Sequence, residues 1–422
     1  MVPHPFTENT PVRALLRAPA SDCQVRLSAR GHSALGVLGA VSVGLISALA
    51  LSGCSDGKNP DPSPSTVSAS SASPSTSTEA ETTSPEPDPA TPSLEDKEHR
   101  VIATDLAAPW SVVEVNNPAT SEVSHIVSLR DSGQIVHVGG GRTTTVLATL
   151  PGVVHSSEDG LLGLAYHPDF GLYAYYSTAK DNRIVVMDLT WDGAVPKLTE
   201  PEPILTGIEH AATHNGGRIA FGPDGKLYAT TGDAREDLAF GGPSDTVRML
   251  GKILRINPDG TRPSDNPFTG SFMWSLGHRN VQGIAWAPDG TMYASEFGQS
   301  TFDELNVIEK GGNYGWPDVE GIANNSNYID PIAQWETSDA SPSGIAIAND
   351  RVYIANLRGS SLRWVDLTDP TKQGDQLTQS VGRIRDVTVS SNGTLLVLTN
   401  NTDGRGDPFP GDDRLLEVGL AD

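Results

Sequence analysis

The feature that most constrains the fold is a short phrase that occurs six times along the chain. In it, a short apolar strand reaches a turn built on Pro-Asp or Asn, and a second strand follows. The copies occupy residues 110–115, 163–170, 218–229, 283–294, 344–355 and 386–397. Repeats spaced at roughly 40 to 65 residues, each long enough to form about four strands, are typical of propeller blades. The sequence therefore predicts an all-β fold, a six-bladed β-propeller.

We expect the propeller to occupy residues 98–422. No long helical period interrupts the repeats, and a sandwich or barrel would not need six copies of one phrase. Whether the first and last strands of the domain share a closing blade stays open at this point. Residues 415–418, Leu-Leu-Glu-Val, are a candidate for that blade.

The first 53 residues are typical of a bacterial lipoprotein signal peptide. Four arginines precede a run of small and apolar residues at 33–51, and the run ends in Leu51-Ser52-Gly53-Cys54. Cys54 is the predicted lipidation site, and the alternative is an uncleaved membrane anchor. Residues 54–97 are rich in Ser, Thr and Pro, so they predict a disordered tether. The expected location is therefore outside the cell, with a lipid anchor in the outer face of the membrane.

The chain is strongly acidic. Its formal charge is -23, and removal of residues 1–53 would bring it to -25. This balance argues against nucleic acid or an anionic membrane surface as a partner, so the lipid anchor would be the contact with the membrane. It also makes any cluster of arginines conspicuous. The two cysteines are Cys23 and Cys54, so the mature fold is expected to contain no disulfide.

His214 and Asp233 form the first candidate constellation. His214 precedes one predicted strand, and Asp233 follows the neighbouring strand of the same hairpin, nineteen residues later. A carboxylate beside an imidazole holds one tautomer and stabilises its charged form, which makes the histidine a better base. The alternative is a surface histidine and a turn-forming aspartate.

Arginines and amides form two further constellations. Arg279, Asn280 and Gln282 offer planar, directional donors that suit carboxylates and carbonyls. Arg383 and Arg385 lie two residues apart, so on a strand they point to the same side. With Arg358 from another blade, these arginines suggest an anionic ligand in the central funnel. The alternatives are a hydrogen-bond network between blades and exposed salt bridges of little energetic value.

The fourth constellation is a Gly-rich corner followed by acidic residues. It contains Gly298, Gln299, Asp303, Glu304 and Tyr314. Hard cations such as Ca²⁺ bind carboxylates and backbone carbonyls, which such a corner exposes. The spacing matches no EF-hand loop, and the alternative is a solvated acidic loop.

Together these motifs resemble the pyrroloquinoline quinone (PQQ)-dependent aldose sugar dehydrogenases, the soluble glucose/sorbosone dehydrogenase-like family. The resemblance covers about residues 100–420 and rests on five segments, at residues 158–170, 214–218, 277–283, 303–317 and 383–386. It implies a six-bladed propeller with PQQ over the central funnel, Ca²⁺ as a second cofactor and an aldose as substrate. The electron acceptor that reoxidises the enzyme stays unknown.

The resemblance also implies roles for individual residues. His214 is similar to the general base, Asp233 to its orienting partner, and Arg279 to the arginine beside the quinone oxygens. Glu158 stands where glucose-oxidising members have Gln, so the particular sugar stays open. The remaining implied cofactor contacts are Asn280, Gln282, Asp303, Arg358, Arg383 and Arg385.

The family resemblance assigns calcium to the acidic corner. The carbonyls of Gly298 and Gln299 would bind the Ca²⁺ that polarises PQQ. Glu304 and Tyr314 would bind a second, structural Ca²⁺. The leading hypothesis is thus the oxidation of aldoses to lactones. Two alternatives remain, a cofactor-free extracellular propeller that binds sugar or protein, and a Ca²⁺-dependent hydrolase of lactones or esters. The converging arginines favour the dehydrogenase.

Overall fold

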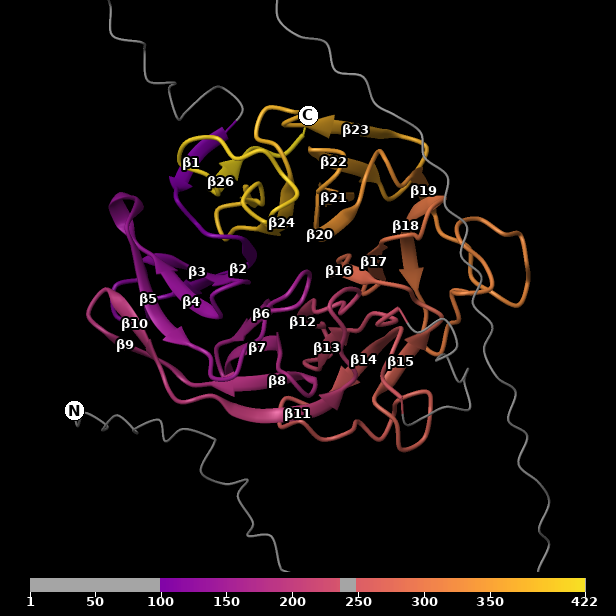
Figure 1. The fold of residues 1–422 in the computed structure, drawn as a ribbon, viewed down its shortest axis with the longest axis horizontal. Helices are drawn as coiled ribbons and strands as arrows, with labels where there is room; N and C mark the ends of the chain where they lie inside the picture. Colours follow the sequence, from indigo (N-terminus) through magenta and orange to yellow (C-terminus); the bar gives the residue numbers. More distant parts are fainter. Residues whose placement is uncertain (1–98, 236–247, 422) are drawn as a thin grey trace, which may run out of the picture. The chain divides into compact units, whose positions relative to one another are not determined.

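The computed structural model describes residues 99–235 and 248–421, and these residues form a β-propeller. Six four-stranded antiparallel sheets are arranged as blades (Figure 1). The predicted signal peptide, the tether and Cys54 lie outside the described residues. Within the described ranges, no helix is long and apolar enough to cross a membrane.

Each blade runs from an innermost to an outermost strand. Blade 1 comprises β2 (Pro109–Asn116), β3 (Val123–Leu129), β4 (Gln134–Val138) and β5 (Thr144–Thr149). Blade 2 comprises β6 (Leu161–His167), β7 (Gly171–Ser177), β8 (Asn182–Met187) and β11 (Glu202–Ile208). Blade 3 comprises β12 (Ile219–Phe221), β13 (Leu227–Thr230), β14 (Lys252–Ile256) and β15 (Met273–Leu276).

The second half of the domain continues this pattern. Blade 4 comprises β16 (Val281–Trp286), β17 (Met292–Glu296), β18 (Phe302–Ile308) and β19 (Ala333–Glu336). Blade 5 comprises β20 (Pro342–Ala348), β21 (Arg351–Asn356), β22 (Ser361–Asp366) and β23 (Gln373–Gln376). A short 3-10 helix, η2 (Gly140–Arg142), and a hairpin of β9 (Leu189–Asp192) and β10 (Val195–Leu198) lie outside these sheets.

Blade 6 is shared between the two ends of the domain. It comprises β24 (Ile384–Val389), β25 (Leu395–Thr399), β26 (Leu415–Val418) and β1 (His99–Ala103). β1 pairs antiparallel with β26, with His99 opposite Val418. The first strand therefore closes the ring, and residues 415–418 do belong to the closing blade.

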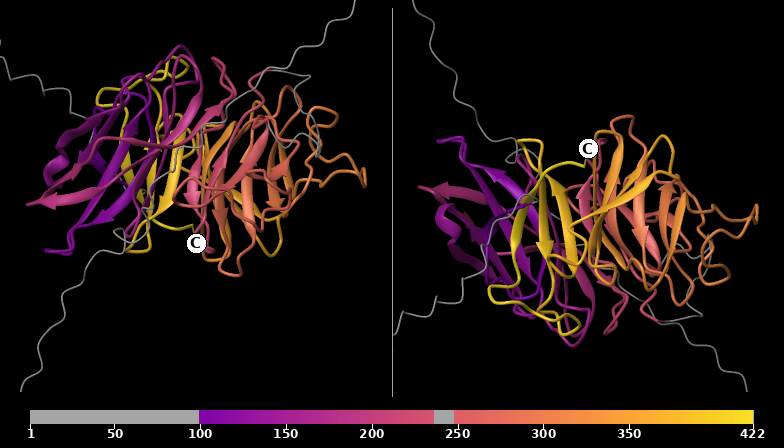
Figure 2. Two further views of the ribbon diagram at one scale, coloured as in Figure 1. Left: turned by 90° about the horizontal axis from the view of Figure 1, so that it is seen from below. Right: turned by 90° about the horizontal axis from the view of Figure 1, so that it is seen from above.

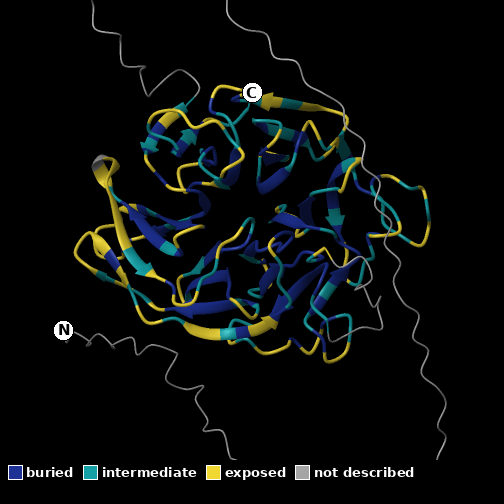
Figure 3. Cartoon of the chain, viewed as in Figure 1, coloured by how far each residue is buried: buried dark blue, intermediate teal, exposed yellow. Residues whose placement is uncertain are grey.

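The core lies between adjacent blades. Six clusters of buried apolar side chains occur, one for each pair of neighbouring sheets. The inner and middle strands are buried on both faces, so they form continuous apolar runs such as β25, Leu-Leu-Val-Leu-Thr. Figure 3 shows this buried interior and the more exposed outer strands. Figure 2 shows the blades from the side, with loops at both ends.

A glycine near the start of the inner strands reflects how closely these strands approach one another. A Cβ at Gly283 would collide with the carbonyl oxygen of Ser343 on the next blade. A Cβ at Gly344 would collide with the Asp386 carboxylate. The repeated glycine of the sequence phrase is therefore a consequence of packing at the centre.

Candidate active site

The predicted site residues gather at one end of the propeller. Some lie on loops that precede the inner strands, as do His214 before β12, Arg279 before β16 and Arg383 before β24, and others on loops that follow the second strands, as does Asp233 after β13. The predicted site residues within strands are Gln282 on β16, Asp303 and Glu304 on β18, and Arg385 on β24. Because neighbouring strands are antiparallel, these two sets of loops meet at the same end of each blade. Loops held by a rigid scaffold are a common place for functional residues.

His214 and Asp233 form a close pair, as the sequence predicts. His214 Nδ1 lies 2.7 Å from Asp233 Oδ1, and both side chains are buried. Burial alone would raise the pKa of Asp233, but hydrogen bonds from His214 and from the Arg235 N–H hold that pKa below its usual value. An ionised Asp233 accepts a hydrogen bond from Nδ1–H of His214, so the lone pair that can take a proton lies on Nε2.

Arg279 occupies the other side of the imidazole. Its Nη2 lies 3.2 Å from His214 Nε2, and its Nη1 donates to the carbonyls of Gly298 at 2.6 Å and Phe297 at 3.2 Å. The guanidinium is partly buried, and burial lowers the pKa of Arg279. His214 is therefore held between an acceptor at Nδ1 and a cationic donor at Nε2.

Trp316 is a site residue that the sequence analysis did not identify. Its indole Nε1 donates to Asp233 Oδ2 at 3.0 Å, and the Arg279 guanidinium lies 5.5 Å from its ring centroid. It therefore fixes the carboxylate that orients His214. The residue belongs to the turn-rich segment 311–317, whose glycines and proline indicate a loop and give no indication of a contact with a different blade.

Glu158 contacts the histidine through the backbone. Its Oε2 accepts the His214 N–H at 3.1 Å, and its Oε1 pairs with Arg405 at 2.9 Å. Burial alone would raise the pKa of Glu158, but the His214 N–H and the Arg405 charge hold it below its usual value. Glu158 is thus an ionised residue at the rim of the site, and Arg405 is a second contact that the sequence analysis missed.

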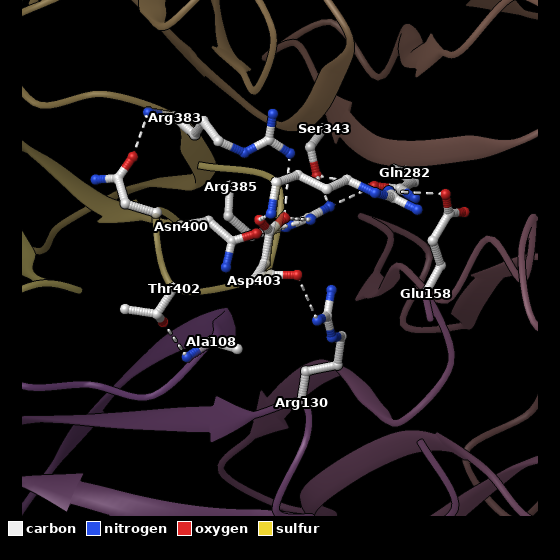
Figure 4. A network of polar contacts seen from close by, with 12 residues as sticks. Ala108, Arg130, Glu158, Gln282, Ser343, Arg383, Arg385, Asn400, Thr402 and Asp403 are labelled. Carbon is white, nitrogen blue, oxygen red and sulfur yellow. Dashed lines mark hydrogen bonds and ion pairs between the residues drawn. The ribbon is translucent and has the colours of Figure 1, made fainter. Parts of the chain in front are cut away.

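Arg383 and Arg385 lie together with Asp403 in the network of Figure 4. Arg383 Nη2 lies 3.1 Å and Arg385 Nη2 lies 3.6 Å from Asp403 Oδ2. The two arginines do share one side, as their spacing predicts. Burial alone would raise the pKa of Asp403, but the two arginines hold it below its usual value. Arg130, which the sequence analysis missed, donates to the Asp403 carbonyl at 3.5 Å.

Gln282 and Arg385 belong to a buried hydrogen-bond network between blades. Arg385 donates to Gln282 Oε1 at 2.8 Å and to Asn400 Oδ1 at 2.8 and 3.0 Å, and Ser343 also donates to Gln282. Burial lowers the pKa of Arg385 to about 9. The inter-blade network considered for Arg279, Asn280 and Gln282 is therefore present for Gln282, and also for Asn280, whose Oδ1 accepts the Gly216 N–H at 3.0 Å.

Arg358 is not brought into this cluster. It is exposed on the loop after β21, and its Nη1 donates to the Thr337 carbonyl at 3.4 Å. An exposed guanidinium is open to an anionic ligand, so the role of Arg358 as a cofactor contact stays a prediction. The loop that carries Arg358 packs on Ala340 and Ser341, which directs the backbone but leaves the long side chain in solvent.

The acidic corner surrounds a small cavity. Glu296, Glu304, Glu320, Gly298 and Tyr314 are among its lining residues, and its volume of about 10 Å³ is close to that of one water molecule or ion. Within residues 99–235 and 248–421, no three His, Cys, Asp or Glu side chains converge in a geometry ready for a metal. A cation there would therefore depend on carbonyl as well as carboxylate oxygens.

The individual residues of this corner are engaged as follows. Asp303 accepts the N–H groups of Gly298 at 2.9 Å and Ser341 at 2.6 Å. Glu304 accepts the Gly321 N–H at 2.6 Å. The Tyr314 hydroxyl donates to the Val307 carbonyl and accepts the Glu309 N–H, so its main-chain carbonyl is the oxygen open to a cation.

Gly232 offers a test of how closely the catalytic loop is packed. A Cβ at this position would collide with the carbonyl of His214. We expect Gly232→Ala to displace His214, to cost about 1–3 kcal/mol of stability and to lower turnover. Urea unfolding and steady-state kinetics measure the two effects. Gly419→Ala, after β26, where a Cβ would meet nothing within 4 Å, controls for the loss of a glycine, and equal turnover of the two variants would contradict this packing.

The comparisons with known proteins show the family of the chain. The family model described as glucose/sorbosone dehydrogenase matches residues 106–409. The chain belongs to the glucose/sorbosone dehydrogenase family. The resemblance and the propeller fold predicted from the sequence are thereby confirmed.

Several family relatives are informative. The chain is 35% identical to quinoprotein glucose dehydrogenase B of Acinetobacter calcoaceticus over 258 residues, which are 52% of this chain and 54% of that enzyme. It is 26% identical to the Escherichia coli aldose sugar dehydrogenase YliI, over 72% of this chain and 90% of that protein. The solved PQQ-bound aldose sugar dehydrogenase of Streptomyces coelicolor is 44% identical, with a TM-score of 0.70 over 76% of this chain and 97% of that one.

Proposed function

We propose that this chain is a PQQ- and Ca²⁺-dependent dehydrogenase that oxidises aldoses at the anomeric carbon to lactones. The observation that carries the proposal is the arrangement of His214 between Asp233 and Arg279, at the end of the propeller that also holds Arg383 and Arg385. The family relatives support it, since they include a quinoprotein glucose dehydrogenase and a PQQ-bound aldose sugar dehydrogenase.

The residues present fit an anionic cofactor. Within residues 99–235 and 248–421, three buried donors of the site have no hydrogen-bond partner, namely Arg279 Nε, Asn280 Nδ2 and Arg383 Nε. Buried donors without partners are rare in native proteins, so each of them can serve an acceptor on a ligand. PQQ carries three carboxylates and quinone oxygens, which guanidinium and amide groups recognise. Arg279, Asn280, Arg383 and, from beneath, Gln282 with Arg385 would hold it.

PQQ, when bound, supplies the acceptor for the hydride that leaves the sugar. His214 supplies the base: its Nε2 would take the proton of the anomeric hydroxyl as the C–H bond breaks and the lactone carbonyl forms. Asp233 would stabilise the imidazolium that results, and Trp316 would keep Asp233 in place. Arg279 must turn from Nε2 for the proton to reach it, and its charge then lies beside the developing negative charge.

A hydrolase fits the centre of the propeller less well. A hydrolytic metal at the axis would need carboxylates that converge there. The described axis residues are instead Arg385, which reaches blades 4 and 5, and Arg218, which pairs with Asp386. Binding of PQQ tests the proposal directly. Titration of the full chain with PQQ in the presence of Ca²⁺ should give saturable binding that weakens in Arg383→Gln, and a chain that does not bind PQQ would refute it.

The acidic corner fits a hard cation. The carbonyls of Gly298 and Gln299 remain the proposed ligands of one Ca²⁺, and Glu304 and Tyr314 those of a second, structural Ca²⁺. Gly298, Glu304 and Tyr314 line the cavity together with the Arg279 guanidinium. Because the Gly298 carbonyl accepts from Arg279, calcium there would compete with that guanidinium for the same oxygen. Calcium at this position would therefore also release Arg279 from one of its present acceptors.

Removal of calcium should change stability in a pH-dependent way. Burial raises the pKa of Asp303 to about 6, and burial together with the Glu296 charge raises that of Glu304 to about 7. Both folded-state values exceed the unfolded ones, so the stability of the metal-free protein falls as pH rises through this range, by on the order of 3 kcal/mol for Asp303. Calcium bound by the ionised Glu304, or close to the ionised Asp303, would offset this loss.

We therefore expect EDTA to lower Tm more at about pH 8 than at about pH 5. Differential scanning calorimetry with and without Ca²⁺ measures the difference, and Mg²⁺ serves as the control cation. An EDTA effect of equal size at both pH values would contradict the assignment of the cation to these carboxylates.

We further propose that the protein is exported and lipid-anchored through Cys54. The basic and apolar segments before Leu51-Ser-Gly-Cys54 support this proposal. A Cys54→Ser variant should lose incorporation of labelled fatty acid and shift from the membrane fraction to the soluble fraction. Unchanged labelling of this variant would contradict the anchor.

A further inference from the structure

A second pocket lies at the end of the propeller opposite His214. It has a volume of about 400 Å³ and is formed by blades 3 and 4. Asp224 lies in the turn from β12 to β13, and Thr291 lies in the turn from β16 to β17. The loops of the active site lie at the other end of the same strands, so the two sites are separated by the length of a blade.

Aromatic rings form the floor of this pocket. Trp274 and Trp286 are each partly exposed, and both pack edge-on against the buried ring of Tyr228, with centroid distances of 5.6 and 5.0 Å. Partly exposed indoles that are braced by a buried tyrosine present rigid apolar faces to solvent. Such faces are costly to leave open to water and gain free energy when an apolar surface covers them.

Oxygen acceptors stand at the rim. The Asp224 carboxylate is held by the Tyr228 hydroxyl at 3.2 Å and by Arg255 Nε at 2.8 Å, and the Glu309 side chain is exposed. The indole Nε1 of Trp274 is buried and has no hydrogen-bond partner in the part of the chain that the structure describes. The pocket therefore combines apolar faces with carboxylate acceptors and one unsatisfied donor, a pattern common to ligand sites.

The charges around the pocket restrict the ligand. A cationic ligand would meet Arg255 and Lys310, which already lie 5.3 and 5.8 Å from the ring centroid of Trp274. An anionic ligand would meet Asp224 and Glu309. The ligand that remains is neutral, with an apolar face for the indoles and hydroxyl groups for the carboxylates. The C–H face and the equatorial hydroxyls of a pyranose ring have this character.

We propose that this pocket binds a neutral pyranoside, with its apolar face on Trp274 and Trp286 and its hydroxyls on Asp224 and Glu309. The pocket contains no part of the His214 site, so we propose that it binds the saccharide without oxidising it. The inference stands independently of the reaction proposed above. At this end of the domain the pocket would hold the protein on a glycan while the active site stays open.

Calorimetric titration with methyl β-D-glucopyranoside and cellobiose tests the proposal. The methyl glycoside has no free anomeric hydroxyl, so it cannot be oxidised at that carbon. We expect the wild-type chain to bind at least one of the two, and Trp286→Ala to bind about tenfold or more weakly. Trp191→Ala, on the β9–β10 hairpin, is the matched control and should bind like the wild type.

Two further variants locate the binding and keep the test decisive. His214→Ala should bind the glycosides as the wild type does, because its change is confined to the other end. Thr291→Arg places a long side chain in the pocket without removing a ring, and it should abolish binding even if Trp286→Ala proves unstable. Turnover of a free aldose should be the same in Thr291→Arg and the wild type.

Three results would overturn the proposal. The first is a wild-type chain that binds neither glycoside. The second is binding that His214→Ala abolishes and that Trp286→Ala and Thr291→Arg leave intact, which would assign it to the active site. The third is binding of tetramethylammonium in place of the glycosides, which would make the pocket a cation cage.

Discussion

Replacing His214 by alanine is expected to lower kcat about 10²- to 10⁴-fold, the usual contribution of a positioned base, while PQQ still binds. His214 Nδ1 is held by Asp233 at 2.7 Å, so Nε2 alone is available to take the proton of the sugar hydroxyl. Steady-state dye reduction with an aldose measures the loss. A parallel PQQ titration shows whether the cofactor site survives the substitution.

Two further variants serve as comparisons for His214→Ala. Asp233→Asn should give a smaller loss, because the amide can still contact Nδ1 but no longer stabilises the imidazolium. His155→Ala removes a histidine on a nearby loop that contacts Asp159 and Asp131, and it should leave kcat nearly unchanged. Wild-type turnover by His214→Ala would remove His214 as the base and leave the cofactor assignment standing.

Loss of one partner of the Arg218–Asp386 pair should strongly destabilise the domain. Arg218 lies at the centre, where its Nη1 is 2.9 Å from Asp386 and its Nε donates to the Gln282 carbonyl at 2.8 Å. Its guanidinium also lies 4.3 Å from the ring centroid of Trp110. The pair thus links blades 1, 3, 4 and 6 near the centre of the propeller.

Arg218→Met should cost about 3–5 kcal/mol, because it leaves the Asp386 carboxylate buried and unpaired. Burial already raises the pKa of Asp386 even with the arginine present, which shows how poorly this position tolerates a charge. Urea unfolding measures the loss. The double variant Arg218→Met/Asp386→Leu should recover part of it, because no lone charge remains.

The surface pair Lys197–Asp192 provides the comparison. Both side chains are largely exposed, so Lys197→Ala should change the unfolding midpoint little. If Arg218→Met unfolded at the same urea concentration as Lys197→Ala, the central pair would have no structural role.

The sequence predicts the blades well because each phrase is local. Two strands and a turn within a dozen residues determine their own pairing, as in β16 and β17, where Ile284 lies opposite Ala294. The closure of the ring is different. β1 pairs with β26 across nearly the whole domain, and no local pattern shows which distant strand completes a sheet.

In the candidate site, too, contacts within one hairpin could be predicted and contacts between blades could not. His214 and Asp233 could be predicted because they flank one hairpin. Trp316 could not, because its contact with Asp233 depends on how the loops of blades 3 and 4 fold over each other. Arg130 shows a signal that was available. It follows the second strand of blade 1, where the other blades place Asp233 and Asp403, so alignment of the blades would have found it.

Arg358 shows a different limit. Its position on a loop at the end of a second strand is as predicted, but the side chain is exposed, so its role as a cofactor contact stays a prediction. Glu304 and Tyr314 do line one cavity, yet the tyrosine hydroxyl is occupied within the fold. Residue type and loop position therefore predict which residues share an end of the propeller, but not which of their atoms stay free for a ligand.

The most direct test of the whole account is PQQ-dependent oxidation of an aldose by the full chain. The metal-depleted apo protein is mixed with Ca²⁺, a redox dye and a panel of aldoses, and PQQ is then titrated. We expect no dye reduction without PQQ, saturable reduction with it, and a lactone as the product. Saturable PQQ binding without dye reduction by any aldose, or reduction that is independent of PQQ, would contradict the account.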